Sequence, residues 1–280
     1  MQFAFLPLAS CFPAFLLLAL LAYWQLAIAE GVHLGPRVVR LLYDWTARRY
    51  DAIKCFDAGD EAWFLGAPLA QSMANIPAPL ILDVACGTGR LPKTLLNQPD
   101  FKGKIIGLDA SRQMLAEAAR ALGDEAPLIW QSAERLPFDD DTFDAVTCLE
   151  ALEFMPSTAR ALAEIRRVLR PGGLLLTTNR IGLGAQLMPG HTVSPPAFEQ
   201  LLAGLGFEQL QTRIWQVDYS LVWAVRSGDG RGGGAQPLAR ILACPHCRKR
   251  LARVADAWHC PACAHVYPVA RDGVIEMLNR

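Results

Sequence analysis

Hydrophobic and polar residues alternate along the middle of the chain in the manner of strands separated by helices. Short apolar runs predict seven strands, at 80–85, 104–108, 128–131, 143–149, 174–178, 207–215 and 219–226. Ser111 precedes a helical pattern that runs to about Leu122, and residues 159–169 form an amphipathic helix stopped by Pro171. This alternation predicts an α/β fold with a doubly wound, mostly parallel seven-stranded sheet, whose ligand crevice lies at the carboxyl ends of the strands.

The first 29 residues are strongly apolar. No charged residue precedes Glu30, and residues 14–22 consist only of Ala, Phe and Leu. A helix of about 20 apolar residues is long enough to cross the hydrocarbon core of a bilayer. We therefore expect residues 1–29 to form a transmembrane anchor. Two alternatives are a buried core helix and a cleaved signal peptide, which the small residues at 27–29 favour and the lack of a basic start disfavours.

Basic residues follow this apolar segment and none precedes it. The first four are Arg37, Arg40, Arg48 and Arg49. Because positively charged flanks stay on the cytoplasmic side of a membrane, this bias places the rest of the chain in the cytoplasm. The sequence therefore predicts a single-pass membrane protein whose later domains are cytoplasmic.

Composition narrows the class of protein. The chain has 280 residues, enough for one large domain and a small one. With 52% hydrophobic residues it has ample material for a core, which excludes wholesale disorder. Its 27 basic and 27 acidic residues give a formal net charge of zero, which argues against a chain-wide electrostatic grip on nucleic acid.

The cysteines fall into two groups of four. Cys11, Cys55, Cys86 and Cys148 are scattered, as small buried hydrophobic residues are. The other four form the paired knuckles CPHC and CPAC, which contain Cys244, Cys247, Cys260 and Cys263. Two such knuckles place four thiolates around a structural zinc ion, and two disulfides are the alternative. Four sulfurs close the zinc shell, so the nearby His246, His259 and His265 are expected not to be ligands.

Glycine divides the carboxyl-terminal part of the chain from the rest. Residues 227–237 (SGDGRGGGAQP) contain five glycines and resemble a flexible linker. We therefore expect four parts: an anchor at 1–29, the α/β domain at 30–226, a flexible linker at 227–240 and a zinc-ribbon domain at 241–280.

The first predicted strand and its turn carry the most specific chemistry. A glycine turn, CGTG at 86–89, follows this strand, and Asp109 ends the next one, where an acid typically binds ribose hydroxyls. Asp83 lies inside the first strand, where a carboxylate would repel a pyrophosphate but suits a ligand with an ammonium and a sulfonium. Pro92 replaces the third small residue of the dinucleotide fingerprint, and no phosphate-binding GKS/T sequence occurs. These features favour S-adenosylmethionine; a purely structural turn is the alternative.

Four motifs in order strengthen this interpretation: LDVACGTGR, GLDAS, SAERLPFDDDTFDAV and EIRRVLRPGGLLLTTNR. Together they resemble the class I S-adenosylmethionine-dependent methyltransferases, nearest the ubiquinone/menaquinone-biosynthesis branch (methyltransferase type 11). The resemblance covers about Tyr43 to Arg226 and includes YDWTARRYD upstream. It implies a Rossmann-like methyltransferase fold and an enzyme that transfers a methyl group from S-adenosylmethionine.

The resemblance also implies a cofactor site, comprising Tyr50, Asp83, Ala85, Gly87, Gly89, Asp109, Ala110, Ser132, Ala133 and Glu134. In the family the first motif surrounds the methionine part, the acid corresponding to Asp109 holds the ribose, and the 132–134 segment lies against adenine. The family often has an acid where Ser132 stands, so the contact with the adenine amino group is weaker or falls to Glu134 or to backbone. Tyr50 and Asp51 are expected to close over the cofactor.

The tail has its own resemblance. CPHCRKRLARVADAWHCPACAHVYPVARDGVIEML is similar to the small zinc-ribbon activator subunits that bind methyltransferases of tRNA, rRNA and release factors. In that family the ribbon is usually a separate chain, so here we expect it to dock in cis on the methyltransferase domain. Its basic residues meet RNA or anionic headgroups, or form a solvated edge; these are Arg248, Lys249, Arg250 and Arg253.

The motifs and the two resemblances leave two enzymatic functions and one non-enzymatic alternative. The first is a membrane-anchored methyltransferase of a lipid-like or quinone-like small molecule, and the second is a methyltransferase of RNA or protein with an in-cis activator. After the fourth strand the chain reads CLEALE rather than the Asn/Asp-Pro-Pro-aromatic sequence of amino-methylating enzymes, which favours the first class and makes nucleic acid an unlikely partner. A non-catalytic membrane scaffold is the third. Candidate general bases are His191, Glu150 and Glu153.

Overall fold

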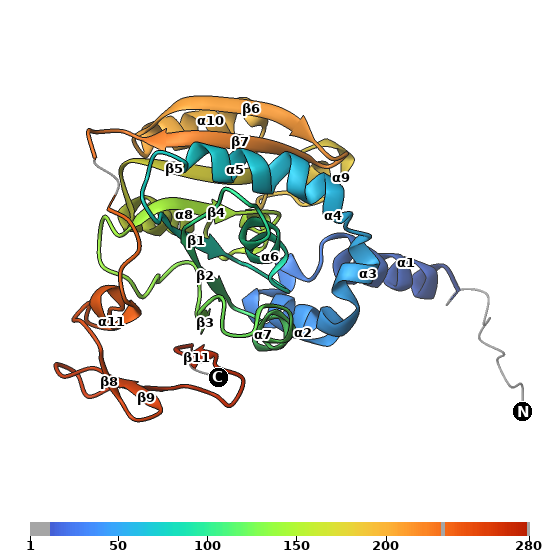
Figure 1. Cartoon of the computed structure of the whole chain (residues 1–280). Helices are drawn as coiled ribbons and strands as arrows, with labels where there is room; N and C mark the ends of the chain where they lie inside the picture. Colours follow the sequence, from blue (N-terminus) through green and yellow to red (C-terminus); the bar gives the residue numbers. More distant parts are fainter. Residues whose placement is uncertain (1–11, 231–232, 279–280) are drawn as a thin grey trace, which may run out of the picture.

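In the computed structural model, which describes residues 12–230 and 233–278, one sheet organises the molecule (Figure 1). Its strands lie in the order β11-β3-β2-β1-β4-β5-β7-β6. Neighbours from β11 to β5 are parallel, and β7 is antiparallel to both β5 and β6. The strand bounds are β1 Leu80–Val84, β2 Lys104–Asp109, β3 Leu128–Trp130, β4 Phe143–Cys148, β5 Leu169–Arg180, β6 Phe207–Trp215, β7 Tyr219–Arg226 and β11 Ile275–Glu276.

The predicted doubly wound, mostly parallel sheet is present, but it has eight strands instead of seven. The eighth, β11, comes from the carboxyl-terminal segment 241–280, which the sequence predicts to be a zinc ribbon docked on the sheet domain. A two-residue strand carries too little hydrophobic pattern to be recognised in a sequence. The rest of the ribbon forms a small antiparallel sheet in the order β10-β9-β8, with bounds β8 Ala252–Val254, β9 Ala257–His259 and β10 Val266–Pro268.

Helices cover both faces of the large sheet (Figure 1). Ser111 starts α7 as predicted, since its side-chain oxygen accepts a hydrogen bond from the Met114 N–H at 3.2 Å. The α-helices are α1 Phe12–Tyr23, α2 Pro36–Thr46, α3 Tyr50–Lys54, α4 Ala58–Glu61, α5 Ala67–Ser72, α6 Arg90–Leu96, α7 Arg112–Leu122, α8 Thr158–Val168, α9 Gly182–Gln186, α10 Pro195–Gly204 and α11 Leu238–Ile241. Short 3-10 and π turns are η2 Trp24–Ile28, η3 Val32–Leu34, η4 Ala47–Arg49, η5 Ala62–Gly66 and η6 Leu152–Phe154.

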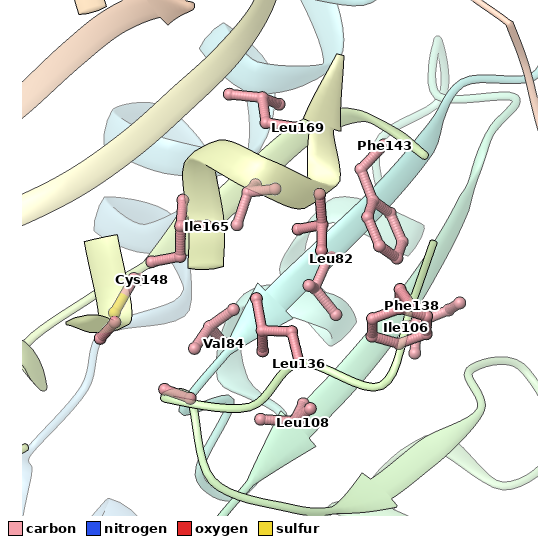
Figure 2. Close-up of a cluster of buried hydrophobic side chains, with 14 of the residues drawn as sticks. Leu82, Val84, Ile106, Leu108, Leu136, Phe138, Phe143, Cys148, Ile165 and Leu169 are labelled. Carbon is pink, nitrogen blue, oxygen red and sulfur yellow. The ribbon is translucent and has the colours of Figure 1, made fainter. Parts of the chain in front are cut away.

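The central strands are buried on both faces. Leu80, Leu82 and Val84 of β1 belong to one core cluster and Ile81 to another, because successive side chains of a strand point to opposite faces. Figure 2 shows the first cluster, in which Leu82 and Val84 lie among residues of β2, β4 and α8. Helices packed on both faces fix the sheet rigidly, and they leave the carboxyl ends of its strands as the place for a ligand.

The prediction of a transmembrane anchor at 1–29, and with it that of a single-pass membrane protein, is wrong for the described residues. Among residues 12–230 and 233–278, no helix is both long and apolar enough to cross a membrane. Helix α1 has 12 residues, about 18 Å at 1.5 Å per residue, against about 30 Å of hydrocarbon. Residues 1–11 of the predicted anchor lie outside the described part.

The chain after α1 packs on the protein instead of continuing an anchor. The Trp24 indole N–H donates to the Leu187 carbonyl oxygen at 2.9 Å, and Ala29 is fully buried beside Val32 and Met188. The leucines of α1 itself are exposed, so α1 is not a core helix either. Hydropathy alone overestimated the span because it does not register where an apolar segment turns onto a neighbouring surface.

The zinc-ribbon part docks on the sheet through its backbone. The Met277 and Leu278 N–H groups donate to the Trp130 carbonyl oxygen at 3.0 and 2.9 Å, and Leu242 forms a β-bridge with Phe138. Apolar ribbon side chains belong to the same core cluster as the sheet; among them are Leu251, Trp258, Tyr267 and Met277. The sheet and the ribbon therefore share one hydrophobic core.

The segment predicted to be a flexible linker also contacts the sheet. The Gly233 N–H donates to the Asp144 carboxylate at 3.0 Å, and the Ala235 N–H donates to the Ala78 carbonyl oxygen at 2.6 Å. Asp144 in turn pairs with the buried Arg170. These contacts hold Gly233 and Ala235 against β4 and the residues that precede β1.

Candidate functional site

A cavity of about 330 Å³ opens at the carboxyl ends of β1, β2 and β4, within the usual size range of small-molecule pockets. The chain connects β1 to β2 on one side and β4 lies on the other, so the cavity is at the point where the strand order reverses. We call it the cofactor cavity. Residues from many elements line it: Pro36, Val39, Arg40, Tyr43, Tyr50, Ala85, Gly87, Leu108, Asp109, Ala110, Ser111, Met114, Gln131, Ser132, Ala133, Glu134, Leu149, Glu150, Ala151, Phe154, Met155, Pro156 and Leu278.

The turn after β1 brings backbone to the floor of this cavity. Ala85 and Gly87 have φ values of 59° and 55°, so the chain reverses tightly there. A Cβ added to Gly87 would meet no atom within 4 Å, which leaves open space above the turn. Gly89, also predicted to bind the cofactor, does not line the cavity. A Cβ at Gly89 would come within 2.9 Å of Leu122, so this glycine allows α6 and α7 to pack closely.

Asp109 closes one side of the turn. One carboxylate oxygen accepts the Gly87 N–H at 2.9 Å, and the other accepts the Ser111 N–H at 2.7 Å. Burial raises the pKa of Asp109 to about 6 despite these hydrogen bonds. The carboxylate is therefore rigidly held at the end of β2, in the position from which an acid binds ribose hydroxyls.

Asp83 lies on the other side of the turn, in a smaller hollow shared with Gly87 and Arg90. The Thr147 hydroxyl donates to its carboxylate at 2.6 Å, and burial raises its pKa to about 7. A cationic ligand would favour the ionised form of such a group.

The far end of the cavity is formed by residues 131–134 and the ribbon residue Leu278. Oxygen Oε1 of Glu134 is buried and has no hydrogen-bond partner among the residues that the structure describes. A buried acceptor without a partner is costly, and an amino group placed beside it would remove that cost. Ser132 stands where the family often has an acid, and its hydroxyl oxygen accepts the Glu134 N–H at 3.3 Å. The residues at this end therefore fit an adenine.

The four ribbon cysteines converge. Their sulfur atoms lie within 4.8 Å of one another, with Cys244 to Cys263 at 3.5 Å and Cys247 to Cys260 at 3.4 Å. Zn–S bonds of about 2.3 Å in a tetrahedron need sulfurs about 3.8 Å apart, so the cluster fits zinc. The Tyr267 hydroxyl lies 3.1 Å from the Cys244 sulfur. No histidine belongs to the cluster, and the described cysteines form no disulfide.

Comparison with protein families identifies the two parts of the chain that carry the cavity and the cysteine cluster. Residues 82–177 match the family "Methyltransferase domain", and residues 237–273 match the family "Trm112p-like protein". The chain carries a methyltransferase domain followed by a Trm112p-like domain. Both resemblances found in the sequence are thereby confirmed.

Curated relatives match the methyltransferase domain. A demethylmenaquinone methyltransferase of Symbiobacterium thermophilum is 43% identical over 142 residues, which are 48% of this chain and 56% of that protein. A 2-phytyl-1,4-naphtoquinone methyltransferase of Synechococcus elongatus is 34% identical over 149 residues, 50% of this chain and 62% of that protein. The chain thus spans about three fifths of the length of these relatives.

Solved structures show the same fold. The [4+2]-cyclase SpnF has a TM-score of 0.56 at 20% identity, covering 69% of this chain and 97% of its own. A complex between the Haloferax volcanii Trm112 methyltransferase activator and its partner contains a chain with a TM-score of 0.52 at 20% identity, covering 66% of this chain and 98% of its own. At such identities the likeness concerns the fold alone.

The three candidate bases of the methyltransferase domain lie in two different places. Glu150 lines the cofactor cavity, but its carboxylate is paired with Arg90 at 2.9 Å and lies 3.8 Å from Lys54. Glu153 and His191 instead line a second cavity. Burial and the nearby His33 lower the pKa of His191, which keeps its imidazole neutral at pH 7.

Sequence reasoning missed the part of the methyltransferase domain that covers the cavity. Pro36, Val39, Arg40 and Tyr43 are spaced i, i+3, i+4, i+7 on α2, and this face of the helix lines the cavity. The helical spacing of these four residues is a signal that the sequence contains, whereas the adjoining apolar run predicts a membrane helix. Tyr50 also lines the cavity, while the Asp51 carboxylate accepts the Thr88 hydroxyl at 2.6 Å and ties α3 to the glycine turn.

Proposed function

We propose that this chain transfers a methyl group from S-adenosylmethionine to a quinone-like or other lipid-like small molecule. The observation that carries the proposal is the cofactor cavity with its glycine turn and Asp109. Asp83 lies on one side of the turn, in the adjoining hollow, and the buried Oε1 of Glu134, which has no hydrogen-bond partner among the described residues, lies on the other. The curated relatives of the methyltransferase domain act, by their names, on menaquinone precursors and a phytyl naphthoquinone.

The residues present suit each part of S-adenosylmethionine. Asp83 provides negative charge near an ammonium, Asp109 accepts from ribose hydroxyls, and Glu134 accepts from the adenine amino group. When bound, the cofactor supplies an electrophilic methyl on a positively charged sulfur. The open space above Gly87 leaves room for the cofactor to lie against the turn.

An apolar acceptor suits the remainder of the cavity. Val39, Leu149, Phe154 and Met155 line it beside the polar residues of the cofactor end. Any apolar part of the acceptor buried there gains roughly 25 cal/mol per Å² of surface removed from water. Covering by α2 and the aromatic ring of Tyr50 excludes water, and displacement at a sulfonium depends mainly on such positioning and exclusion.

Two measurements test the proposal. Isothermal titration of the zinc-loaded protein with S-adenosylmethionine should give one site per chain. Incubation with chemically reduced 1,4-naphthoquinone should then yield a product heavier by one methylene, detected by mass spectrometry. Heat without a methylated product would overturn the quinone-like acceptor, and absence of heat would favour a non-catalytic scaffold.

The Trm112p-like domain favours one second candidate, methylation of RNA or protein with the ribbon as an activator in cis. Labelled S-adenosylmethionine incubated with total tRNA and with a ribosome-associated protein fraction separates the two. Label in either macromolecule, with none in the naphthohydroquinone, would replace the first proposal by the second.

For the ribbon, we propose one structural zinc ion per chain on Cys244, Cys247, Cys260 and Cys263. We also propose that residues 30–226 and 241–280 form the two domains. Because the ribbon supplies β11 and part of the shared core, it supports the methyltransferase domain in cis.

A further inference from the structure

A second cavity of about 330 Å³ adjoins the cofactor cavity. Its walls are the segment after β4 (152–159), the carboxyl end of β5 (178–180), the segment after α9 (190–193) and part of α10. Met155 and Pro156 line both cavities and form the wall between them. We call this the β5 cavity. The flexible side chain of Met155 therefore separates a molecule in the β5 cavity from the cofactor cavity.

An arginine with unused hydrogen-bond donors lies at the β5 cavity. Arg180 ends β5, and its Nε and Nη1 are buried without a hydrogen-bond partner in the described part of the chain. The aromatic rings of Phe154 and Tyr219 are each centred 5.9 Å from its guanidinium carbon. Leaving charged donors unpaired in a buried place is costly, so a site built this way favours a ligand with an acceptor oxygen.

The nearest acid is placed to complement the arginine. Glu153 Oε1 lies 3.8 Å from Arg180 Nη1, which is too far for a direct hydrogen bond. It already accepts the Tyr219 hydroxyl at 2.6 Å. One hydroxyl oxygen about 2.8 Å from both the guanidinium and the carboxylate would bridge this gap, since 2.8 Å is an ordinary hydrogen-bond length.

Arg90 shows how a buried arginine without this role is arranged. Its guanidinium donates to Glu150 at 2.9 Å, lies 3.3 Å from Glu61 and stacks on the Phe56 ring at 3.9 Å. Two carboxylates neutralise it at short range. Nη1 of Arg90 also lacks a hydrogen-bond partner among the described residues, so the two arginines differ in how their charge is paired. Within the described residues the nearest carboxylate oxygen to the Arg180 guanidinium, that of Glu153, lies 3.8 Å away, beyond hydrogen-bond distance.

We propose that Arg180 and Glu153 bind a ring hydroxyl of the methyl acceptor in the β5 cavity. The inference rests on the proposed function. Glu153 takes the hydroxyl proton, the O–H electron pair stays on oxygen as a phenolate, and Arg180 faces the negative charge. The ring thereby becomes nucleophilic at the edge that points past Met155 toward the cofactor cavity.

The surroundings set the proton balance of this step. Burial raises the pKa of Glu153, which makes its carboxylate a stronger base than an exposed one. The groups facing Arg180 are Glu153 on η6, Tyr219 on β7, Asp218 before β7 and Glu30 on the amino-terminal segment, and His191 lies on the wall after α9. Arg180 is the only cation among them, so its removal should suppress ionisation of the bound hydroxyl.

Binding of 1-naphthol, a fluorescent phenol, to the full zinc-loaded chain with S-adenosylmethionine present tests the proposal. Arg180→Gln and Glu153→Gln should each weaken naphthol binding about 10- to 100-fold, the usual effect of losing a charged hydrogen bond. Arg180→Lys should restore part of it. Matched exposed controls, Arg213→Gln and Glu208→Gln, should leave it unchanged.

A second variant keeps the test valid if the buried variants fail to fold. Ala159→Trp fills the β5 cavity from its exposed rim and should also weaken naphthol binding, with the dissociation constant for S-adenosylmethionine unchanged in every variant. Unchanged naphthol binding in folded Arg180→Gln and in Ala159→Trp would overturn the proposal. Failure of the proposed function differs, since there S-adenosylmethionine would not bind or no methyl would be transferred while naphthol binding still depended on Arg180.

Discussion

Two segments from opposite ends of the chain complete the cofactor cavity, and they are attached in different ways. The carboxyl-terminal segment joins the sheet through strand β11, the Met277 and Leu278 backbone hydrogen bonds and a shared core, and it brings Leu278 to the cavity. The amino-terminal segment brings α2 and Tyr50 to the same cavity without pairing to any strand.

Because the two segments are attached differently, loss of the carboxyl-terminal one should lower stability, and loss of the amino-terminal one should lower ligand affinity. A strand added to a sheet edge removes unpaired backbone groups from water and buries apolar surface, so its loss weakens the whole fold. A helix held by a few side chains can be loosened at little cost to the core, so its loss should weaken ligand binding first. Five predictions test this contrast.

The largest effect is expected at the zinc cluster. Cys260→Ser should lose the metal and unfold the ribbon, because about 40 residues without a metal bury too little surface to fold. Loss of β11 and its core should then lower the melting temperature of the methyltransferase domain by more than 10 °C, a rough figure for several kcal/mol. Metal analysis and calorimetry measure both. Cys55→Ser, at an exposed cysteine outside the cluster, is the control.

Met277→Pro weakens the backbone pairing of the carboxyl-terminal segment with β3 and leaves the four cysteines unchanged. It removes the N–H that donates to Trp130 and a buried side chain, and should cost about 2–4 kcal/mol of unfolding free energy with one zinc still bound. Met277→Leu keeps both features and should cost less than about 1.5 kcal/mol. Equal stability of the two variants in urea would show that the strand pairing contributes little.

Asp109→Ala measures how much binding the sheet itself supplies. It should weaken S-adenosylmethionine binding by on the order of 1.5–3 kcal/mol, because two charge-assisted contacts with ribose are lost. Isothermal titration gives the value, with the exposed Asp100→Ala as reference. An unchanged affinity would refute the ribose assignment.

The pH dependence follows from burial of the same acids. The folded pKa values of about 7 for Asp83 and about 6 for Asp109 exceed the ordinary 3.8, so the native state binds more protons than the unfolded chain. The free energy of unfolding should therefore fall as pH rises from about 4 to 7. Cofactor affinity should rise about tenfold between pH 5.5 and 8, as the acid that faces the cation ionises. Asp83→Asn should flatten this rise in a titration series.

The smallest effect is expected at the attachment of the amino-terminal segment. Asp44 on α2 accepts the Ser111 hydroxyl at 2.6 Å and the Gln113 N–H at 3.0 Å. Asp44→Ala should raise the dissociation constant for S-adenosylmethionine about fivefold and cost less than about 1 kcal/mol of stability, a usual value for hydrogen bonds that are partly open to solvent. A larger loss of stability than of affinity would erase the contrast between the two segments.

The local features of the molecule can be predicted from neighbouring residues alone. The glycine turn, the acid at the end of β2, the Ser111 cap and the paired CxxC knuckles are each encoded within a few neighbouring residues, and the structure has the predicted strands around them. Period-2 and helical patterns are local too, so they predicted the alternating α/β order.

The tertiary structure was needed for every feature that depends on residues far apart in the chain. It paired residues 275–276 with β3, turned the apolar segment after α1 onto Leu187, and separated Glu150 from Glu153 into two cavities. Hydropathy scores each segment as if it met only solvent or lipid, whereas these outcomes depend on which surface the folded sheet presents to it. Burial is a property of two surfaces in contact, and the sequence of a single segment describes only one of them.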